Sequence, residues 1–375
     1  MNYIHEFDSK KNNKRSLLDK KRKRNKKKFI VNKKNKNIIK NKAKKKFKGI
    51  KSPKNIKLLY NITNDSFANI AIDNTFTVFN SVDNILYLIY ANYSMSIICY
   101  DLNINQKVCE IYNNEYISSF RHCLDKNNKR DLIMVLIHDN YIKIWNVKNF
   151  ECLLCIQNIN KKGYLYSGCF LKDCNQIYIV TSNMSYLDCE PIKIYDLNGN
   201  IKEEINNSND TTFFIDIFYD NKSLKKYIIV GSNGFVKSYD FSKNELYKKY
   251  LDYYNKEPHC SIVINNDKKI TKLIESCDDG NIRIWNFHSG LLLKKINISE
   301  ENNSLFGICL WNKDYLFVGC ENKTIKLIDL KSGLIIKKLD GHYNSVTTIK
   351  KIKHPKYGLI LISQSFILDQ IKLWN

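Results

Sequence analysis

The amino-acid sequence predicts an all-β protein, a single seven-bladed β-propeller over residues 55–375 that follows a disordered basic tail over residues 1–52. Three observations lead to this prediction. A short alternating apolar segment recurs seven times, its recurrences are about one blade apart, and most of the positive charge lies before the first of them. The pattern therefore separates a repeat fold from a charged segment without apolar periodicity.

The recurring segment is a run of alternating apolar residues that ends in an aromatic residue or Ile and is followed by Asp or Asn. Such alternation predicts a strand with one buried face. The terminal residues, here called the anchor residues, are Tyr100, Trp145, Tyr195, Tyr239, Trp285, Ile328 and Trp374. They lie 43 to 50 residues apart, with room for three more strands before each one. Four strands in such a period are typical of a propeller blade.

The sixth unit shows the four predicted strands most clearly, over residues 291–296, 305–310, 315–319 and 324–328. The last unit ends on its anchor segment, Trp374-Asn375, and so needs one more strand from elsewhere in the chain. Residues 55–62 alternate well enough to supply it. Closure of this kind leaves only short, protected strand edges.

The repeats resemble the WD40 repeat family over about residues 55–375, and the last unit has the fullest signature. In that family a His, a Ser, an Asp and a Trp form a hydrogen-bonded structural tetrad in a blade. The resemblance implies this role for His342, Ser365, Asp369 and Trp374 in the last unit, for His259, Asp279 and Trp285 in the fifth, and for Asp139 and Trp145 in the second. Glu275 occupies the position where the family usually has Ser.

The resemblance also implies a non-catalytic scaffold that binds protein partners. Their usual binding surface in the family is the face formed by the loops between blades (d–a loops) and the turns between the two middle strands of a blade (b–c turns). Tyrosine suits such a surface because it combines a large ring with a polar tip. The candidates on this face are His138, Tyr254, Asp278, Glu321 and Tyr343.

Residues 1–52 contain 22 Lys and Arg against 3 Asp and Glu, a net charge of +19, whereas the rest of the chain has +5. The densest cluster is Lys20, Lys21, Arg22, Lys23, Arg24, Lys26, Lys27 and Lys28. Such clusters indicate nuclear import or RNA contact. A membrane-surface role lacks a second anchoring signal. Codon bias is the third interpretation, because Asn makes up 49 of the 375 residues throughout the chain.

The sequence contains no P-loop, GxSxG, HExxH or helix-opening GxGxxG motif, so we predict no catalytic residue, cofactor or metal. Cys152 and Cys155 have the spacing of a CxxC site, but on a strand they would point to opposite faces. We interpret the 12 cysteines as reduced and mostly buried. No apolar run is long enough to span a membrane and no secretory signal is visible, so we expect an intracellular protein.

Three functions remain. The leading one is a protein-interaction scaffold. The alternative is a nuclear or nucleolar RNA-associated assembly factor of the pre-ribosome type, which would use the basic tail; the cytoplasm is the alternative location. The third is a ubiquitin-ligase substrate receptor, disfavoured because the Arg that such receptors often have after the Trp-Asp pair is replaced by Lys148 and His288.

Overall fold

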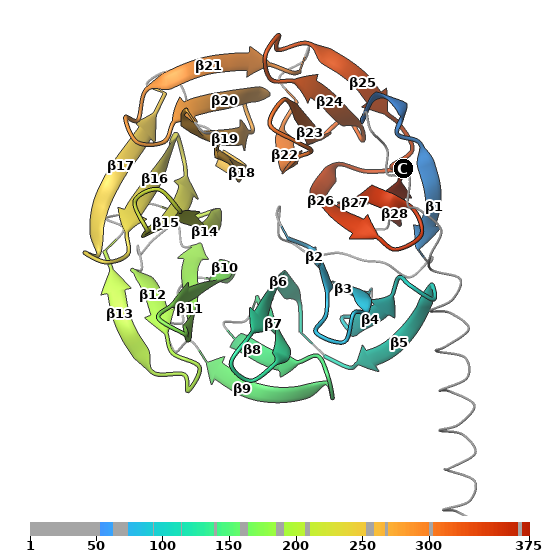
Figure 1. Cartoon of the computed structure of the whole chain (residues 1–375), viewed down its shortest axis with the longest axis vertical. Helices are drawn as coiled ribbons and strands as arrows, with labels where there is room; N and C mark the ends of the chain where they lie inside the picture. Colours follow the sequence, from blue (N-terminus) through green and yellow to red (C-terminus); the bar gives the residue numbers. More distant parts are fainter. Residues whose placement is uncertain are drawn as a thin grey trace, which may run out of the picture. The chain divides into compact units, whose positions relative to one another are not determined.

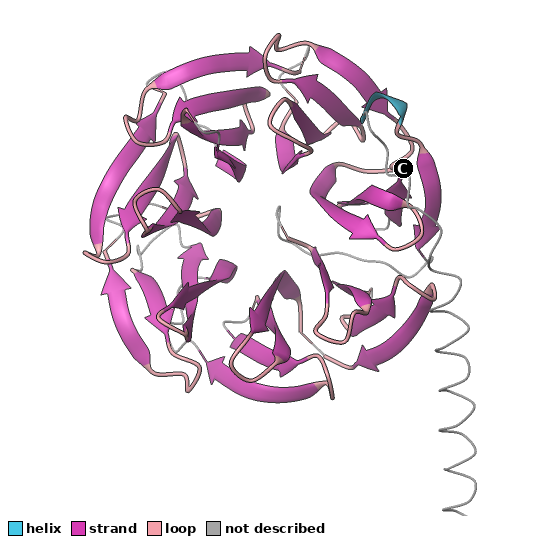
Figure 2. Ribbon diagram, in the orientation of Figure 1, coloured by secondary structure: helices cyan, strands magenta, loops and turns pink. Residues whose placement is uncertain are grey.

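The computed structural model divides the chain into two units, residues 1–48 and 49–375, and its described part belongs to the second. The described residues are 53–62, 74–92, 94–113, 115–138, 141–157, 164–184, 191–206, 211–252, 259–266, 269–299, 303–366 and 370–375. The predicted basic tail and its disorder lie outside these residues. The described residues form seven four-stranded antiparallel sheets, which are arranged in a ring as the blades of a propeller (Figures 1 and 2).

We number the blades in chain order and call their strands a to d from the centre of the ring outward (Figure 1). Blades 1 to 3 contain β2 (Phe76–Asn80), β3 (Leu86–Ala91), β4 (Ile97–Asp101) and β5 (Gln106–Ile111); β6 (Ile117–Asp125), β7 (Arg130–Ile137), β8 (Tyr141–Asn146) and β9 (Glu151–Gln157); and β10 (Tyr164–Asp173), β11 (Gln176–Met184), β12 (Ile192–Tyr195) and β13 (Ile201–Ile205). Blades 4 and 5 contain β14 (Phe214–Asp220), β15 (Lys225–Ser232), β16 (Phe235–Asp240) and β17 (Glu245–Leu251); and β18 (His259–Asn266), β19 (Thr271–Cys277), β20 (Asn281–Asn286) and β21 (Leu292–Asn297). Blades 6 and 7 contain β22 (Leu305–Leu310), β23 (Tyr315–Cys320), β24 (Ile325–Asp329) and β25 (Ile335–Leu339); and β26 (Val346–His354), β27 (Gly358–Ser365), β28 (Ile371–Trp374) and β1 (Leu58–Ile62).

The predicted ring closure is confirmed. A short 3-10 helix, η1 (Pro53–Asn55), precedes β1, and β1 pairs antiparallel with β28 as the outer strand of blade 7. The N-terminal side of the described region thus completes a blade whose other three strands come from the end of the chain, and β1 lies beside β28 in Figure 1. The four strands predicted for the sixth unit are also present, to within one residue at their ends.

The Asp or Asn that follows each anchor residue has a definite local function. In blades 1 to 6 its side-chain oxygen accepts a hydrogen bond from the backbone N–H two residues later, for example Asn103 to Asp101 and Lys331 to Asp329, both 2.8 Å. This Asx turn reverses the chain between strands c and d. Positive backbone φ angles at Asn105 and Asn244 in the same turns show that Asn takes positions that Gly would otherwise fill, as the low Gly content predicts.

The hydrophobic core is divided among the blade interfaces, with one buried cluster between each pair of neighbouring blades. The cluster between blades 6 and 7 contains Trp374 of β28, Phe317 of β23 and Ile56, which precedes β1. These blades also approach closely at their inner strands, because a Cβ atom at Gly319 would overlap the carbonyl oxygen of Val346. Side-chain packing between flat faces therefore holds the ring together.

Candidate protein-interaction face

The d–a loops and b–c turns meet at one end of the blades, and hydrogen bonds join them there. Glu321, in the b–c turn of blade 6, accepts from the N–H of Ser304 through its side chain at 2.9 Å, and its own N–H donates to the Ser304 carbonyl at 3.0 Å. The Ser345 hydroxyl of the next d–a loop donates to the Glu321 carbonyl at 3.2 Å. We call the surface formed by these loops and turns the loop face.

A cationic side chain from strand c lies beneath the loop face in six blades, two residues before the anchor residue. These cations are Lys143, Lys193, Lys237, Arg283, Lys326 and Lys372. Lys143 binds the Asn113 side chain at 3.1 Å, and Lys326 binds the Ile298 carbonyl at 2.8 Å. Both acceptors lie in the chain segment that leads into the same blade. In these two blades strand c thus fastens the described part of its own d–a loop.

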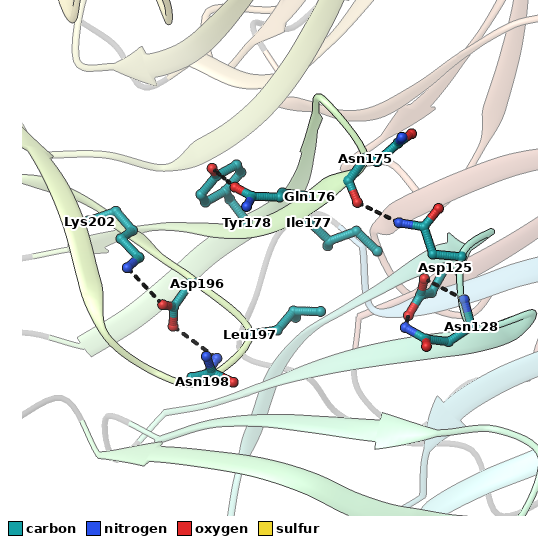
Figure 3. Close-up of a pocket in the computed structure, with 11 residues that line it drawn as sticks. Asp125, Asn128, Asn175, Gln176, Ile177, Tyr178, Asp196, Leu197, Asn198 and Lys202 are labelled. Carbon is teal, nitrogen blue, oxygen red and sulfur yellow. Dashed lines mark hydrogen bonds and ion pairs between the residues drawn. The ribbon is translucent and has the colours of Figure 1, made fainter.

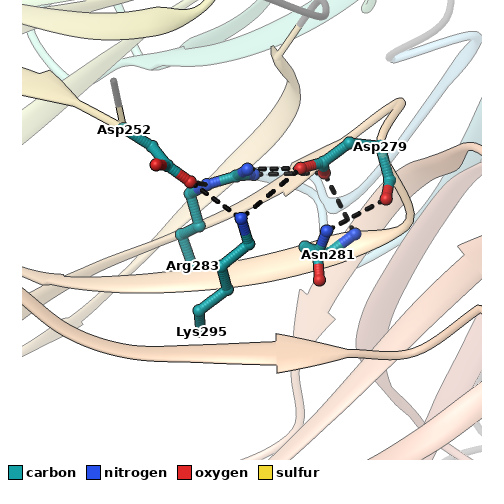
Figure 4. Close-up of polar contacts among 5 residues, drawn as sticks. All are labelled: Asp252, Asp279, Asn281, Arg283 and Lys295. Carbon is teal, nitrogen blue, oxygen red and sulfur yellow. Dashed lines mark hydrogen bonds and ion pairs between the residues drawn. The ribbon is translucent and has the colours of Figure 1, made fainter. Parts of the chain in front are cut away.

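Blade 5 has the strongest version of this contact, an ion network centred on Arg283 (Figure 4). The Arg283 side chain is fully buried and donates from Nε to Asp252 at 2.9 Å and from both terminal nitrogens to Asp279. Lys295 of β21 adds a second cation, 2.9 Å from Asp252. Two aspartates from a d–a loop and a b–c turn are therefore held by cations from strands c and d.

The network changes the pKa values of its acids. Burial favours the neutral form of Asp252, but the hydrogen bonds from Lys295 and Arg283 outweigh it and lower the pKa of Asp252 to about 2. Burial likewise opposes ionisation of Asp279, and Arg283 lowers the pKa of Asp279 below its usual value. Both aspartates are negatively charged at neutral pH, and they compensate the positive charge of the buried Arg283 side chain.

Blade 7 contains a second buried network, which joins a d–a loop to strands b and c. His342 Nε2 lies 2.7 Å from the Ser363 hydroxyl, and the Trp374 indole N–H donates to the same oxygen at 2.8 Å. The serine of this network is Ser363, which corrects the prediction of Ser365. Ser363 and Ser365 lie two residues apart on β27 and share a face, but Ser363 pairs in register with Lys372 of β28, whereas Ser365 lies further along the strand and pairs with Val346 of β26. Asp369 lies outside the described residues.

Among the described candidate contact residues, Tyr343 is highly exposed. Its side chain is 75% exposed in the d–a loop before blade 7, with the Lys372 ammonium 5.5 Å from the ring centre. The Glu321 carboxylate is occupied by the loop contact described above. Asp278 accepts a hydrogen bond from the Cys260 thiol at 3.2 Å, and His138 is half-buried. Tyr254 lies outside the described residues.

Two further tyrosines on the loop face were not among the sequence candidates. Tyr112 and Tyr116, in the d–a segment before blade 2, are 75% and 49% exposed. The Tyr116 carbonyl accepts a hydrogen bond from the His138 N–H at 2.8 Å, so this segment is fastened to the b–c turn of its blade. Their position between β5 and β6 could have identified them as loop-face residues in the sequence. The chain contains so many tyrosines, however, that no single one stands out.

Comparisons with known proteins agree with this architecture. A WD repeat domain-containing protein 83 homolog from Dictyostelium discoideum is 26% identical over 152 residues, which cover 40% of this chain and 44% of that protein. A U3 small nucleolar RNA-associated protein 21 homolog from Schizosaccharomyces pombe is 24% identical over 92 residues, 24% of this chain and 10% of that protein. The matches thus span less than half of either relative, and no protein-family model matches the chain. The seven-bladed ring and the WD repeat relative agree. The chain thus forms a WD40-type propeller and is similar to WD repeat proteins.

The other WD40 blades with an anchor Trp depart from the network of blade 7. In blade 5, His259 is the first residue of strand a and pairs with Cys277, so its backbone does not take the d–a loop position predicted for it. Asp279 binds Arg283 there, and Glu275 occupies the serine position, as the sequence predicts. The indole N–H of Trp285 has no hydrogen-bond partner among the described residues.

Blade 2 differs from the WD40 pattern in another way. Strand pairing places Val135 where blade 7 has Ser363, because Val135 pairs with Lys143 as Ser363 pairs with Lys372. Within the described part of the chain, the Trp145 indole N–H accordingly lacks an acceptor. Asp139, the predicted fourth member, is outside that part. The anchor Trp side chains of blades 2 and 5 therefore stabilise the propeller through packing instead of this hydrogen bond.

The opposite face of the propeller, formed by a–b and c–d turns, contains a polar pocket of about 400 Å³ between blades 2 and 3 (Figure 3). Its carboxylates hold their own turns. Asp125 binds Asn128 and Arg130, at 2.8 and 2.9 Å, and Asp196 binds Lys202 at 3.1 Å. The carboxylates of this pocket therefore stabilise turns, so we do not interpret the pocket as a ligand-binding site.

The interface between blades 1 and 2 contains a His–Asp pair that sequence spacing did not reveal. His122 Nε2 lies 2.8 Å from Asp131 because β6 and β7 pair, and the His122 ring stacks on Phe79 of blade 1 at 3.7 Å. Asp131 also accepts from the Val82 N–H at 2.8 Å. The pair thus joins blades 1 and 2.

Cys152 and Cys155 lie in a strand, β9, as predicted, although the strand has an irregular register between them. Among the residues with described positions, no group of three His, Cys, Asp or Glu side chains could hold a metal ion. No helix in the described ranges is long and apolar enough to cross a membrane.

Proposed function

We propose that this WD40-type propeller is a non-catalytic interaction scaffold whose loop face binds protein partners. WD40 propellers generally act as such scaffolds. The observation that supports this function for this chain is the exposure of two tyrosines. Tyr112 and Tyr343 expose three quarters of their side chains in loops that hydrogen bonds and strand-c cations hold in place. Large rings on a fixed surface lose little conformational entropy on binding, so they suit interface hot spots.

Affinity purification of three full-length proteins from native cells tests this proposal. The test variant is Tyr112→Ser/Tyr343→Ser, and the matched control is Leu224→Ser, in an a–b turn of the opposite face, where the side chain is also highly exposed. We expect the tyrosine variant to lose partner proteins that the wild type and the control both recover. Equal recovery by all three proteins would contradict a role for the loop face.

A second candidate is an RNA-associated assembly factor in the nucleus or nucleolus. Two observations favour it: the net charge of +19 in residues 1–52 and the name of the Schizosaccharomyces pombe relative, which links that protein to a small nucleolar RNA. Neutralised phosphates release counterions, so binding through this segment should weaken steeply with salt.

The test replaces the eight basic residues between Lys20 and Lys28 with Gln in the full chain and compares RNA binding over a salt series, together with the cellular location of both proteins. We expect weaker binding, a shallower salt dependence and loss of nuclear enrichment in the variant. Unchanged RNA affinity and location would favour codon bias as the origin of the lysines.

A further inference from the structure

The outer strands of three consecutive blades share a pattern that the loop-face function does not use. In blades 4, 5 and 6, two apolar residues are followed directly by two lysines. The three copies are Leu246-Tyr247-Lys248-Lys249 in β17, Leu292-Leu293-Lys294-Lys295 in β21 and Ile335-Ile336-Lys337-Lys338 in β25. Leu291 and Leu334 add a further apolar residue before the second and third copies. We call residues 246–249, 291–295 and 334–338 the Leu-Lys band.

Most apolar residues of the Leu-Lys band face solvent, whereas Tyr247 and Ile336 pack partly against the core. Leu291 and Leu334, at equivalent positions of neighbouring c–d turns, are 66% and 65% exposed. Leu246, Leu292, Leu293 and Ile335 are exposed as well. Single exposed apolar residues are ordinary on a protein surface, but recurrence at matching positions of adjacent blades indicates an interaction surface.

The three copies form one continuous band around the rim, where β17, β21 and β25 follow one another (Figure 1). The turns before the second and third copies pack on the lysines of the preceding blade. Gly290 lies against Lys248 and Lys249, and Gly333 lies against Lys294. The Lys294 ammonium also donates to the Lys331 carbonyl at 2.9 Å. Apolar and basic groups therefore alternate along the rim.

The Leu-Lys band keeps a positive charge. Two of its six lysines are paired with carboxylates, Lys295 with Asp252 at 2.9 Å and Lys338 with Asp340 at 3.2 Å. The other four are not neutralised, because Lys294 and Lys337 donate to carbonyl oxygens and Lys248 and Lys249 lie over aromatic rings. The outer strands of blades 2 and 3 have the opposite character, with Glu151, Glu203 and Glu204 among their residues. The rim is thus polarised, and the Leu-Lys band lies on its basic side.

We propose that the Leu-Lys band binds an extended, acidic and leucine-rich peptide segment of a partner protein. Acidic residues of the peptide would meet the lysines, and its leucines would cover Leu291, Leu334 and their neighbours. Strands β17, β21 and β25 are paired on one side only, so their free edges can also form main-chain hydrogen bonds with an extended peptide. Nucleic acid is a less suitable ligand, because phosphate groups make no favourable contact with exposed leucine side chains.

This inference rests on the proposed scaffold function and adds a second surface to it. The test measures fluorescence anisotropy of a labelled peptide of alternating Leu and Glu, a peptide of alternating Ser and Glu with the same charge, and oligouridylate RNA. Each probe is titrated with full-length wild type, Leu291→Ser/Leu334→Ser and the matched control Ile104→Ser/Ile201→Ser. The control residues are similarly exposed on the rim at blades 1 and 3. Thermal midpoints check that all three proteins are folded.

We expect the Leu291/Leu334 variant to bind the Leu-Glu peptide about tenfold more weakly or worse, because part of the apolar contact is lost. The Ser-Glu peptide, which residues 1–52 can attract by charge alone, should bind all three proteins equally. Equal loss in the two double variants, or equal affinity of wild type for both peptides, would overturn the proposal. So would an equal loss of RNA affinity, which would make nucleic acid the ligand. Affinity purification of the Leu291/Leu334 variant distinguishes failure of this proposal from failure of the scaffold function. If the variant recovers all the native partners, the loop-face scaffold stands although the band proposal fails.

Discussion

Lys57 and Asn375 exchange two backbone hydrogen bonds, each 2.7 Å long, across a sequence distance of more than three hundred residues. The pair extends the β1–β28 ladder at the seam of the propeller. Lys337 of blade 6 adds a contact at the same place by donating to the Ile56 carbonyl at 2.7 Å. The segment before β1 thus connects the end of the chain to the neighbouring blade.

Ile56→Ala should destabilise the protein by about 2–4 kcal/mol, because the side chain is fully buried between blades 6 and 7 and its removal leaves a cavity. Chemical denaturation followed by tryptophan fluorescence measures the loss. Leu58→Ala is the matched control, since Leu58 is 44% exposed and its replacement should cost less than about 1 kcal/mol. Similar costs for both changes would mean that the seam does not depend on this buried residue.

Ser363→Ala should cost about 1–3 kcal/mol, since the hydroxyl joins His342 to the Trp374 indole and both groups would be left buried without it. A double-mutant cycle with Trp374→Phe isolates the hydrogen bond. We expect a coupling energy of about 1 kcal/mol between the two positions. A coupling energy near zero would show that the serine and the tryptophan act independently.

Asp252→Asn should destabilise the protein by about 2–4 kcal/mol at neutral pH, because it removes one of the two carboxylates around the buried Arg283 guanidinium. The pKa of Asp252 is lowered to about 2, so its contribution is present above the usual pKa and lost as the pH falls through about 2. The stability difference between wild type and variant should therefore shrink in acid. A difference that does not change with pH would argue against an ionic origin.

His354 should make stability depend on pH in mildly acidic solution. Its Nε2 donates to the Leu102 carbonyl at 3.1 Å and its Nδ1 accepts from the Lys356 N–H at 3.0 Å, a pattern that requires the neutral ring. Burial lowers the pKa of His354, the contact with Leu102 partly opposes this, and the charge of Lys356 lowers it further. The unfolded chain then binds the proton more readily, so stability should fall as the pH drops below about 6.5.

The variant His354→Gln provides the control for this effect. Melting temperatures of wild type and variant between neutral and mildly acidic pH should differ in slope, with the wild type falling more steeply. Parallel slopes would show that another group titrates.

Much of the fold could be predicted from the sequence because the determining pattern is local and repeated. The alternation before Trp145, Trp285 and Trp374 predicts buried strands, and the Asp or Asn after each anchor residue predicts a turn that an Asx hydrogen bond does form. Seven copies at blade spacing predict the ring, and the strand over residues 55–62 predicts its closure.

Parts of the candidate site could not be predicted, since they depend on contacts between segments far apart in sequence. Ser363 and Ser365 are both serines in one strand, and only strand register decides which hydroxyl meets Trp374. The sequence shows a cation at position 283, but it does not show that this cation binds Asp252, because the contact forms only when the d–a loop is folded.

The sequence by itself determined that this chain forms seven repeated β units, where their strands and turns lie, and that its positive charge is concentrated before them, because local periodicity and composition contain that information. Only the tertiary structure decided which polar groups are paired beneath the loop face, which tyrosines remain exposed and that three Leu-Lys segments form one band. The physical reason is that burial and hydrogen-bond pairing depend on neighbouring blades, whose relative placement no single repeat specifies.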